Sequence, residues 1–278
     1  MCYSTLITPE ELLPLLEHEE IVILDCRHNL ADLAMGERAY ARSHLPGARF
    51  FHLDRDLSGP MNGKNGRHPL PDREVMARRF AAAGISNNSQ VVAYDQDSGA
   101  MATRAWWLLR WLGHDHVAVL DGGLPAWVAA GGPLETAPGV ARPAAPYPAR
   151  AEAMPTVQAA DLQRQLGRRP VIDARAAERF RGEVEPLDPV AGHIPGALNR
   201  FFKDNLQPDG RFKPAATLRS EWAGLAADPA QVVHQCGSGV TACHNLLAME
   251  HAGLAGSALY PGSWSEWCAD PARPVARG

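Results

Sequence analysis

The 278-residue sequence lacks an excess of basic residues, a long apolar run and a paired-cysteine motif. A formal net charge of −4 provides no electrostatic footprint for nucleic acid. The strongly apolar run at residues 106–109 ends at Arg110, well short of the roughly 20 residues that a membrane-spanning helix needs. We therefore expect neither nucleic acid nor a membrane among the partners of this chain.

Targeting and metal signals are also missing. Residues 1–5 lack the basic start and apolar stretch of a signal peptide, which favours the cytoplasm. The five cysteines form no CxxC pair and no even framework, so we expect free thiols. None of the eleven histidines has a cysteine or carboxylate at metal-ligand spacing, so we expect no metal.

An internal repeat is present instead. Its matched segments are 22–27 with 171–175, 43–48 with 192–197, and 91–95 with 232–236. A period of roughly 140 residues is about one domain rather than a solenoid unit. The last match places Asp95 where the second half has Cys236, so a cysteine at this point occurs in one copy only.

Each half alternates strands with helices. Short apolar strands are expected at 21–24, 91–94 and 117–120, and again at 171–173, 232–235 and 258–260, with helices at about 100–112 and 239–251. This alternation predicts an α/β fold with a parallel sheet flanked by helices in each half. We expect an inactive first domain over residues 1–137, a Pro/Ala-rich extended linker over 138–155, and a catalytic second domain over 156–278.

Features that occur in both halves cannot explain an activity confined to one. The His-x-Pro-Gly-Ala elements therefore favour structural roles, with His44 and His193 bonded to the backbone beside a turn. An alternative for His44 is that it faces the site of the other domain. Trp127 and Trp267 are expected to pack in the core or between the domains.

The loop Cys236-Gly237-Ser238-Gly239-Val240-Thr241 remains after this comparison. It follows a strand and precedes a helix, at the sheet edge where open α/β proteins bind ligands. Backbone N–H groups of a glycine-rich turn and the helix N-terminus both attract negative charge, which favours thiolate over thiol. Cys236 is thus a candidate nucleophile. A phosphatase would need an arginine where Ala242 stands, so phosphate is a poor ligand for this loop.

This loop resembles that of 3-mercaptopyruvate-using sulfurtransferases in the two-domain rhodanese superfamily. The resemblance extends to residues 25–27, both His-x-Pro-Gly-Ala elements, and residues 121–123 and 262–267. It implies tandem rhodanese domains, of which the second is catalytic and needs no cofactor. It also implies double displacement: Cys236 takes sulfur from a small-molecule donor as a persulfide, and a thiol, thioredoxin or cyanide removes it.

Within the loop, backbone N–H groups are expected to stabilise the negative charge of the transferred sulfur. Ser238 and Thr241 offer hydroxyls that could bond this sulfur or relay a proton to the leaving group. The alternative for both hydroxyls is a capping or first-turn bond at the start of the helix.

The donor is expected to be held by arginines. The resemblance points to Arg179 and Arg181, which on an extended loop would point the same way. Related enzymes carry a second arginine shortly after a Glu-Pro pair, and this chain reads Glu185-Pro186-Leu187-Asp188 there. Arg67 of the first half could supply the missing charge across the interface. Mercaptopyruvate is favoured over thiosulfate because the loop contains no cation for a dianion.

Two other functions stay open on the sequence. Cys236 could carry sulfur or sense redox state without turnover, with Cys243 as a resolving thiol. The segment Asp95-Gln96-Asp97 after a strand superficially resembles a magnesium-dependent phosphotransferase motif, although Asp95 is better interpreted as the degenerate counterpart of Cys236.

Overall fold

The computed structural model describes residues 2–139, 147, 150–225 and 227–278. It forms two compact units. Unit 1 contains Met1–Ser58, Pro71–Ala153 and Pro208–Phe212, and unit 2 contains Gly59–Leu70, Met154–Gln207 and Lys213–Gly278. The contiguous division expected from the sequence does not include this exchange: each unit takes in a short segment from the other half of the chain.

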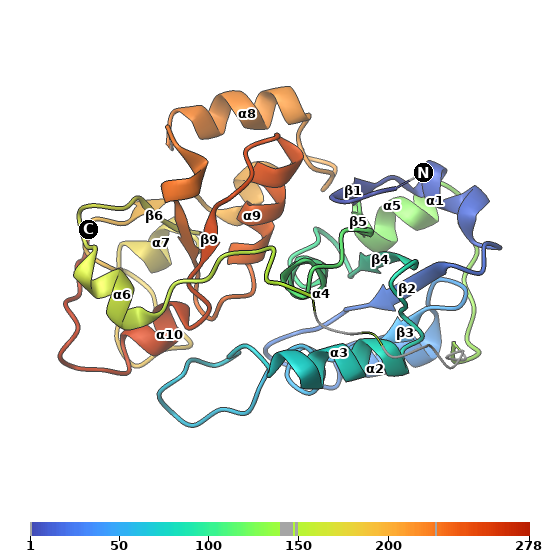
Figure 1. The fold of residues 1–278 in the computed structure, drawn as a ribbon, viewed down its shortest axis with the longest axis horizontal. Helices are drawn as coiled ribbons and strands as arrows, with labels where there is room; N and C mark the ends of the chain where they lie inside the picture. The colour runs from blue at the N-terminus through green and yellow to red at the C-terminus, as the bar shows by residue number, and fades with distance from the viewer. Residues whose placement is uncertain (1, 140–146, 148–149, 226) are drawn as a thin grey trace. The chain divides into compact units, whose positions relative to one another are not determined.

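Unit 1 is built on a five-stranded parallel sheet (Figure 1). Its strands are β1 (Leu6–Ile7), β2 (Ile21–Asp25), β3 (Arg49–Phe50), β4 (Gln90–Tyr94) and β5 (Val117–Leu120), in the order β1-β5-β4-β2-β3. Its helices are α1 (Pro9–Leu12), α2 (Met35–Arg42), α3 (Arg73–Ala82), α4 (Ala102–Trp111) and α5 (Gly123–Ala129), with a 3₁₀ turn at Leu13–Leu15. The expected strands and parallel sheet are confirmed in this unit.

The core of unit 1 follows from the alternation of side chains along each strand. Ile23, Val92 and Tyr94 point to one face of the sheet and form a cluster with Leu12 of α1 and Trp127 of α5. Trp127 is fully buried, and its indole N–H donates to Pro133 O at 2.9 Å. The expected core role of this tryptophan is therefore correct.

Unit 2 repeats the architecture with four parallel strands (Figure 1). They are β6 (Val171–Asp173), β7 (Leu198–Asn199), β8 (Val233–Gln235) and β9 (Ala258–Leu259), in the order β7-β6-β8-β9. The helices are α6 (Ala159–Arg164), α7 (Ala177–Phe180), α8 (Ala215–Ala223), α9 (Ala242–His251) and α10 (Ser263–Trp267), with 3₁₀ turns at Phe202–Asn205 and Pro229–Gln231. The catalytic loop expected from the sequence connects β8 to α9.

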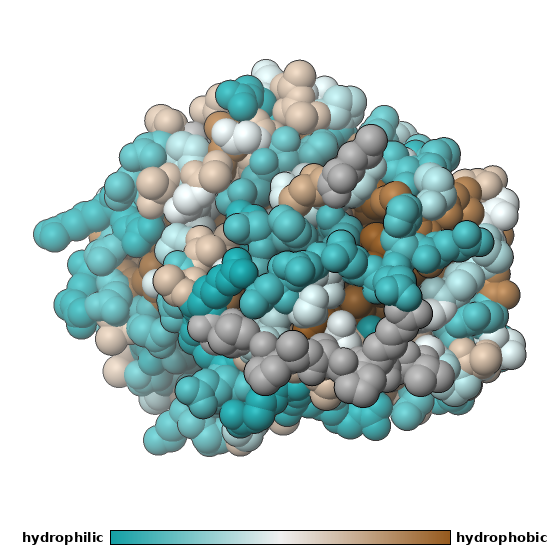
Figure 2. Space-filling view, turned by 45° about the vertical axis from the view of Figure 1, so that its right-hand side comes forward, coloured by the Kyte–Doolittle hydropathy of each residue, from teal (hydrophilic) through white to brown (hydrophobic). Residues whose placement is uncertain are grey.

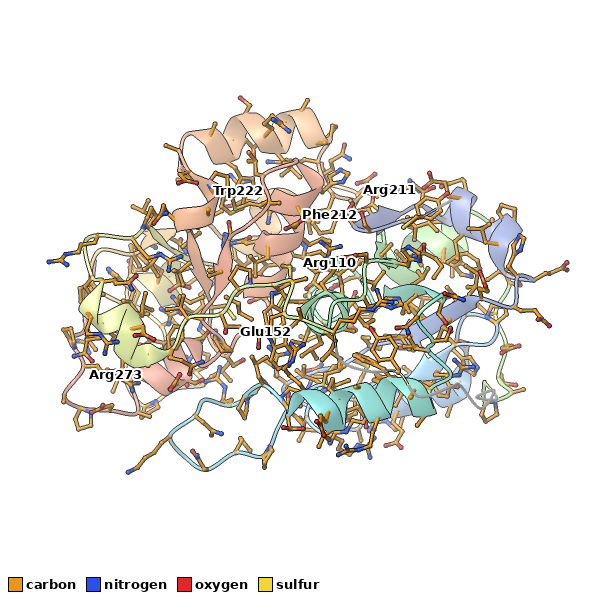
Figure 3. All side chains as sticks on the ribbon, viewed as in Figure 1. Arg110, Glu152, Arg211, Phe212, Trp222 and Arg273 are labelled. Carbon is orange, nitrogen blue, oxygen red and sulfur yellow. The ribbon has the colours of Figure 1, made fainter. Side chains whose placement is uncertain are left out.

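The two faces of the unit 2 sheet are covered by different helices. Val171 and Val233 cluster with residues of α6 and α10, including the fully buried Trp267. On the other face, Trp222 projects from α8 toward the strands (Figure 3), and its ring meets the edge of His234 with the ring centroids 5.6 Å apart. This two-sided cover buries β8 and fixes the position at which the loop leaves the sheet.

An Asp-x-Arg pair reproduces the repeat in three dimensions. Asp25 is in register with Tyr94, and Asp173 is in register with Gln235. Each aspartate pairs with the arginine two residues on, Arg27 or Arg175, through hydrogen bonds from Nε and Nη2. The buried pair ties the end of β2 in unit 1, and of β6 in unit 2, to the turn that follows the strand.

Part of the expected linker, residues 140–146, 148 and 149, lies outside the described residues. The described part does not extend freely: Tyr147 is buried, and Arg150 N–H donates to Leu112 O at 2.9 Å. Within the part of the chain that the structure describes, no helix has the length and apolar character to cross a membrane. The face in Figure 2 is mostly hydrophilic, with hydrophobic residues scattered among polar ones.

Candidate active site

Cys236 is the first residue after β8 and is only 1% exposed. The loop turns at Gly239, whose φ of 77° lies in the left-handed region that glycine adopts without strain. The Gly239 N–H donates to Cys236 Sγ at 3.2 Å, and α9 begins three residues later. A side chain at Gly239 would also collide with the backbone, because its Cβ would lie 2.2 Å from Pro261 O. The glycine therefore shapes a turn that directs an N–H group at the thiol.

The start of α10 fixes the backbone of this loop. Cys236 N–H donates to Ser263 Oγ at 3.1 Å, while Cys236 O accepts from Trp264 N–H at 3.0 Å. Ser263 has a φ of 53°, the one positive value at a non-glycine residue among those described. Its hydroxyl donates to Tyr260 O at 3.0 Å. This strained serine, with a hydrogen bond accepted and one donated, holds the backbone of Cys236 in place.

The corresponding loop of unit 1 is filled by a carboxylate. Asp95 is fully buried and accepts backbone N–H groups from Gly99 at 2.9 Å, Met101 at 2.8 Å and Ala102 at 3.1 Å. Burial raises the pKa of Asp95, and these N–H groups oppose the rise. The net pKa is raised, so the N–H groups do not cancel the effect of burial. The loop of unit 1 still directs three backbone N–H groups at the residue that follows its strand, and the interpretation of Asp95 as the counterpart of Cys236 agrees with its position after β4.

Two guanidinium groups lie beside Gly237. A Cβ built on this glycine would lie 2.9 Å from Nη2 of Arg67 and 3.5 Å from Nη1 of Arg179. Arg67 belongs to the segment Gly59–Leu70, which is part of unit 2. The expectation that Arg67 acts from the first domain across an interface is therefore wrong, since this arginine lies within the same unit as Cys236.

Buried carboxylates hold both guanidinium groups. Nη1 of Arg67 bonds Asp188 Oδ1, and Nη2 of Arg179 bonds Glu185 Oε1 at 2.6 Å. Glu185 also contacts Arg175 at 3.3 Å. Burial raises the pKa of Glu185, but the hydrogen bond and charge of Arg179 outweigh it, and the net pKa is lowered. For Asp188, burial dominates over the contribution of Arg67, and the pKa is raised.

Ser238 contacts a histidine that the sequence did not single out. His68 Nδ1 lies 2.7 Å from Ser238 Oγ, and both residues are buried. This contact is found where the alternative for Ser238 was a helix cap. Thr241 occupies the N-cap position of α9 with helical backbone angles and without a side-chain capping bond. The capping alternative is therefore wrong for both hydroxyls.

Arg181 points away from the site. Its guanidinium forms two hydrogen bonds with Glu183, at 2.7 and 2.9 Å, and its side chain is 44% exposed. The expectation of an extended loop is the source of the error. Arg179 lies in α7 and Arg181 caps it, and residues two apart on a helical turn face different directions.

The two histidines of the repeated turn have backbone partners. His193 Nδ1 lies 2.8 Å from Phe180 O, as expected. His44 is fully buried in unit 1, with its ring nitrogens 2.8 Å from Tyr40 O and 3.0 Å from Ala137 O. The alternative that His44 faces the other domain's site is therefore wrong.

One group of possible metal ligands occurs among the described residues, in unit 1. His28, His52 and Asp54 bring their ligand atoms within 4.8 Å of one another. His52 Nδ1, however, accepts the backbone N–H of Asp54 at 3.1 Å, and its Nε2 lies 3.0 Å from Leu33 O. Both ring nitrogens of this histidine are thus engaged by the backbone.

The residues that sequence reasoning missed are His68, Asp188 and Ser263. His68 directly follows Arg67, and Asp188 ends the segment Glu185-Pro186-Leu187-Asp188 in which the second arginine of related enzymes is missing, but no local pattern joins either residue to Cys236. Ser263 lies in the quoted segment 262–267, and its left-handed backbone is not visible from residue type.

The comparisons with known proteins agree with this geometry. The model of the rhodanese-like domain matches residues 8–130 and 158–270. Over the full length of both chains, the sequence is 49% identical to a probable 3-mercaptopyruvate sulfurtransferase of Pseudomonas aeruginosa. A putative thiosulfate sulfurtransferase of Mycobacterium tuberculosis is 40% identical, over 99% of this chain and 98% of the relative. The structure of 3-mercaptopyruvate sulfurtransferase from Leishmania major covers 95% of this chain, with 74% of its own length matched, a TM-score of 0.84 and 32% identity. The chain therefore belongs to the rhodanese family of sulfurtransferases and carries two copies of its domain.

Proposed function

We propose that this sulfurtransferase takes sulfur from 3-mercaptopyruvate and passes it through a persulfide on Cys236. The observation that carries the proposal is the pair of guanidinium groups beside Gly237, next to the buried thiol. Arg67 and Arg179 would bind the carboxylate and ketone oxygens of a 2-oxo acid by charge-assisted hydrogen bonds. The donor's thiol sulfur then lies toward Cys236.

In the first half-reaction, the Cys236 thiolate attacks the thiol sulfur of the donor. A sulfur–sulfur bond forms and the carbon–sulfur bond breaks, so the electron pair passes to the enolate of pyruvate. That enolate takes up the proton released from the donor thiol. Ser238, with His68 at 2.7 Å, supplies a path for this proton, and Gly239 N–H supports the charge on sulfur.

In the second half-reaction, an acceptor removes the outer sulfur and restores the thiolate. Cyanide would leave as thiocyanate, and a thiol or thioredoxin would leave as a persulfide. A cytoplasmic location stays a prediction from the sequence alone.

Thiosulfate is the second candidate donor, because a 40% identical relative bears the name of a putative thiosulfate sulfurtransferase. A carrier without turnover is the third. Cys243, its candidate resolving thiol, donates its S–H to Gly239 O at 3.4 Å, which ties it to the loop backbone.

The test measures sulfur transfer to cyanide from 3-mercaptopyruvate and from thiosulfate in parallel. Wild type and Cys236→Ser are compared, with intact mass recorded after each donor. We expect faster turnover with mercaptopyruvate, one added sulfur on wild type and none on the variant. The buried Cys243→Ser variant serves as the matched control and is expected to keep the added sulfur. Activity in Cys236→Ser would refute the mechanism, and persulfide without turnover would indicate a carrier.

A further inference from the structure

Asp188 is a carboxylate placed where an anionic donor must arrive. Its side chain is 3% exposed, and its Oδ1 pairs with Arg67. The other oxygen, Oδ2, lies 3.6 Å from Arg179 Nη2 and has no hydrogen-bond partner among the described residues. A buried carboxylate oxygen without a hydrogen bond is costly, so its presence beside both donor-binding arginines calls for a functional explanation.

The charge of the surrounding cluster gives that explanation. Arg67, Arg175 and Arg179 are the cations of the cluster. Asp173, Glu185 and Asp188 are its anions, joined to these arginines by ion pairs. Three positive charges against three negative ones leave a formal sum of zero. The cluster therefore presents N–H donors to a ligand without an excess of positive charge.

Among the three carboxylates, Asp188 is the one joined to both donor-binding arginines. Asp173 pairs with Arg175 only, and Glu185 pairs with Arg175 and Arg179. Glu185 is also secured by backbone N–H groups, from Leu187 at 3.1 Å and from Asp188 at 3.2 Å. Removing the charge of Asp188 thus alters the charge around the donor while leaving the ion pairs of Asp173 and Glu185 in place.

We propose that Asp188 determines donor specificity by limiting the positive charge beside Gly237 to what a singly charged donor needs. The negative charge of Asp188 repels every anion that enters. The repulsion energy is twice as large for a dianion, because Coulomb energy scales with the charge of the ligand. A 2-oxo acid carries its one charge on a carboxylate that two guanidinium forks can satisfy. Thiosulfate carries two charges and would need a cationic excess. This inference rests on the proposed function and names the feature that selects the donor.

The test uses Asp188→Asn, which removes the charge and keeps an oxygen acceptor for Arg67. We expect kcat/KM for thiosulfate to rise at least about tenfold, equivalent to about 1.4 kcal/mol, with a much smaller change for mercaptopyruvate. Glu183→Gln is the matched control, because it removes a carboxylate of the same segment that pairs with Arg181 at the surface. It is expected to leave the donor ratio unchanged.

The outcomes separate this inference from the proposed function. If wild type prefers mercaptopyruvate and Asp188→Asn lowers both donors equally, Asp188 only anchors Arg67 and the inference is wrong. If wild type prefers thiosulfate, both are wrong. If Asp188→Asn does not fold, the wild-type protein still tests the inference. Pyruvate, a monoanion, should inhibit it more strongly than sulfate, a dianion, at low ionic strength. The reverse order would overturn the inference.

Discussion

Gly237 shows how one missing side chain makes room for the guanidinium groups of Arg67 and Arg179. Its Cβ, if present, would approach Nη2 of Arg67 to 2.9 Å, closer than such atoms normally come. The backbone of Gly237 is not in the left-handed region, so an alanine there is not strained by its own conformation. An alanine at position 237 should therefore disturb the Arg67 side chain without straining the backbone of the loop.

We predict that Gly237→Ala raises KM for mercaptopyruvate about tenfold, the result of losing about 1.4 kcal/mol of binding, with a smaller change in kcat. The new methyl displaces Arg67, whereas Cys236 keeps its bond from Gly239. Steady-state kinetics and a thermal melt measure the two effects. Gly224→Ala is the control, because its added Cβ has only an ordinary contact at 3.7 Å. Unchanged KM in Gly237→Ala would place the donor elsewhere.

At the residue scale, the sequence singled out Cys236 as a candidate nucleophile but not the residues that hold its loop. Cys236 and the glycine turn were accessible because the two halves can be compared position by position. Ser263 escaped because the strain at its φ of 53° depends on how α10 meets the loop. Arg181 was placed wrongly because a one-turn helix, α7, is too short to leave a periodic pattern in the sequence.

At the scale of elements, β8 carries a histidine, and β4, the strand at the equivalent position of unit 1, has none. His234 is fully buried between Trp222 and α9, with Nε2 3.1 Å from Met249 Sδ. Burial lowers its pKa from 6.5 to about 3. The strand that precedes Cys236 therefore contains a group that stays neutral in the folded state above about pH 3 and takes up a proton on unfolding only below about pH 6.5.

The sign of the resulting pH dependence follows from this difference. Between pH 3 and 6.5 the unfolded chain binds more protons at His234 than the folded one, so stability is lost as pH falls through that window. One proton gives a slope of up to about 1.4 kcal/mol per pH unit. We predict that His234→Leu flattens the pH dependence by about this slope in urea unfolding measured from pH 4.5 to 7.5. The His18→Gln variant, at an exposed histidine, is the control and should keep the wild-type slope. If His234→Leu also keeps the wild-type slope, the pH dependence does not come from His234.

At the scale of the whole molecule, the two units are not two consecutive pieces of chain. Segment Gly59–Leu70, with Arg67 and His68, belongs to the unit of Cys236, although His68 and Ser238 are 170 residues apart in sequence. In the same way, Phe212 belongs to unit 1, where its N–H donates to Asp121 Oδ1 at 2.8 Å. The repeat indicated two domains but not this exchange, because nothing in a local pattern reports a contact over such a separation.

This exchange predicts that the second half of the chain is incomplete by itself. A fragment of residues 150–278 lacks Arg67 and His68. It also contains the segment Pro208–Phe212 without most of unit 1, to which that segment belongs. We expect sulfur transfer from mercaptopyruvate to fall at least about a hundredfold, since charge-assisted hydrogen bonds contribute about 1.5–3 kcal/mol each. The control is the full chain with a protease site in place of residues 140–146, cleaved after folding, which keeps both halves and should stay active. Full activity in the isolated fragment would mean that Arg67 and His68 do not serve the reaction, and the donor would then have to be held by Arg179 alone.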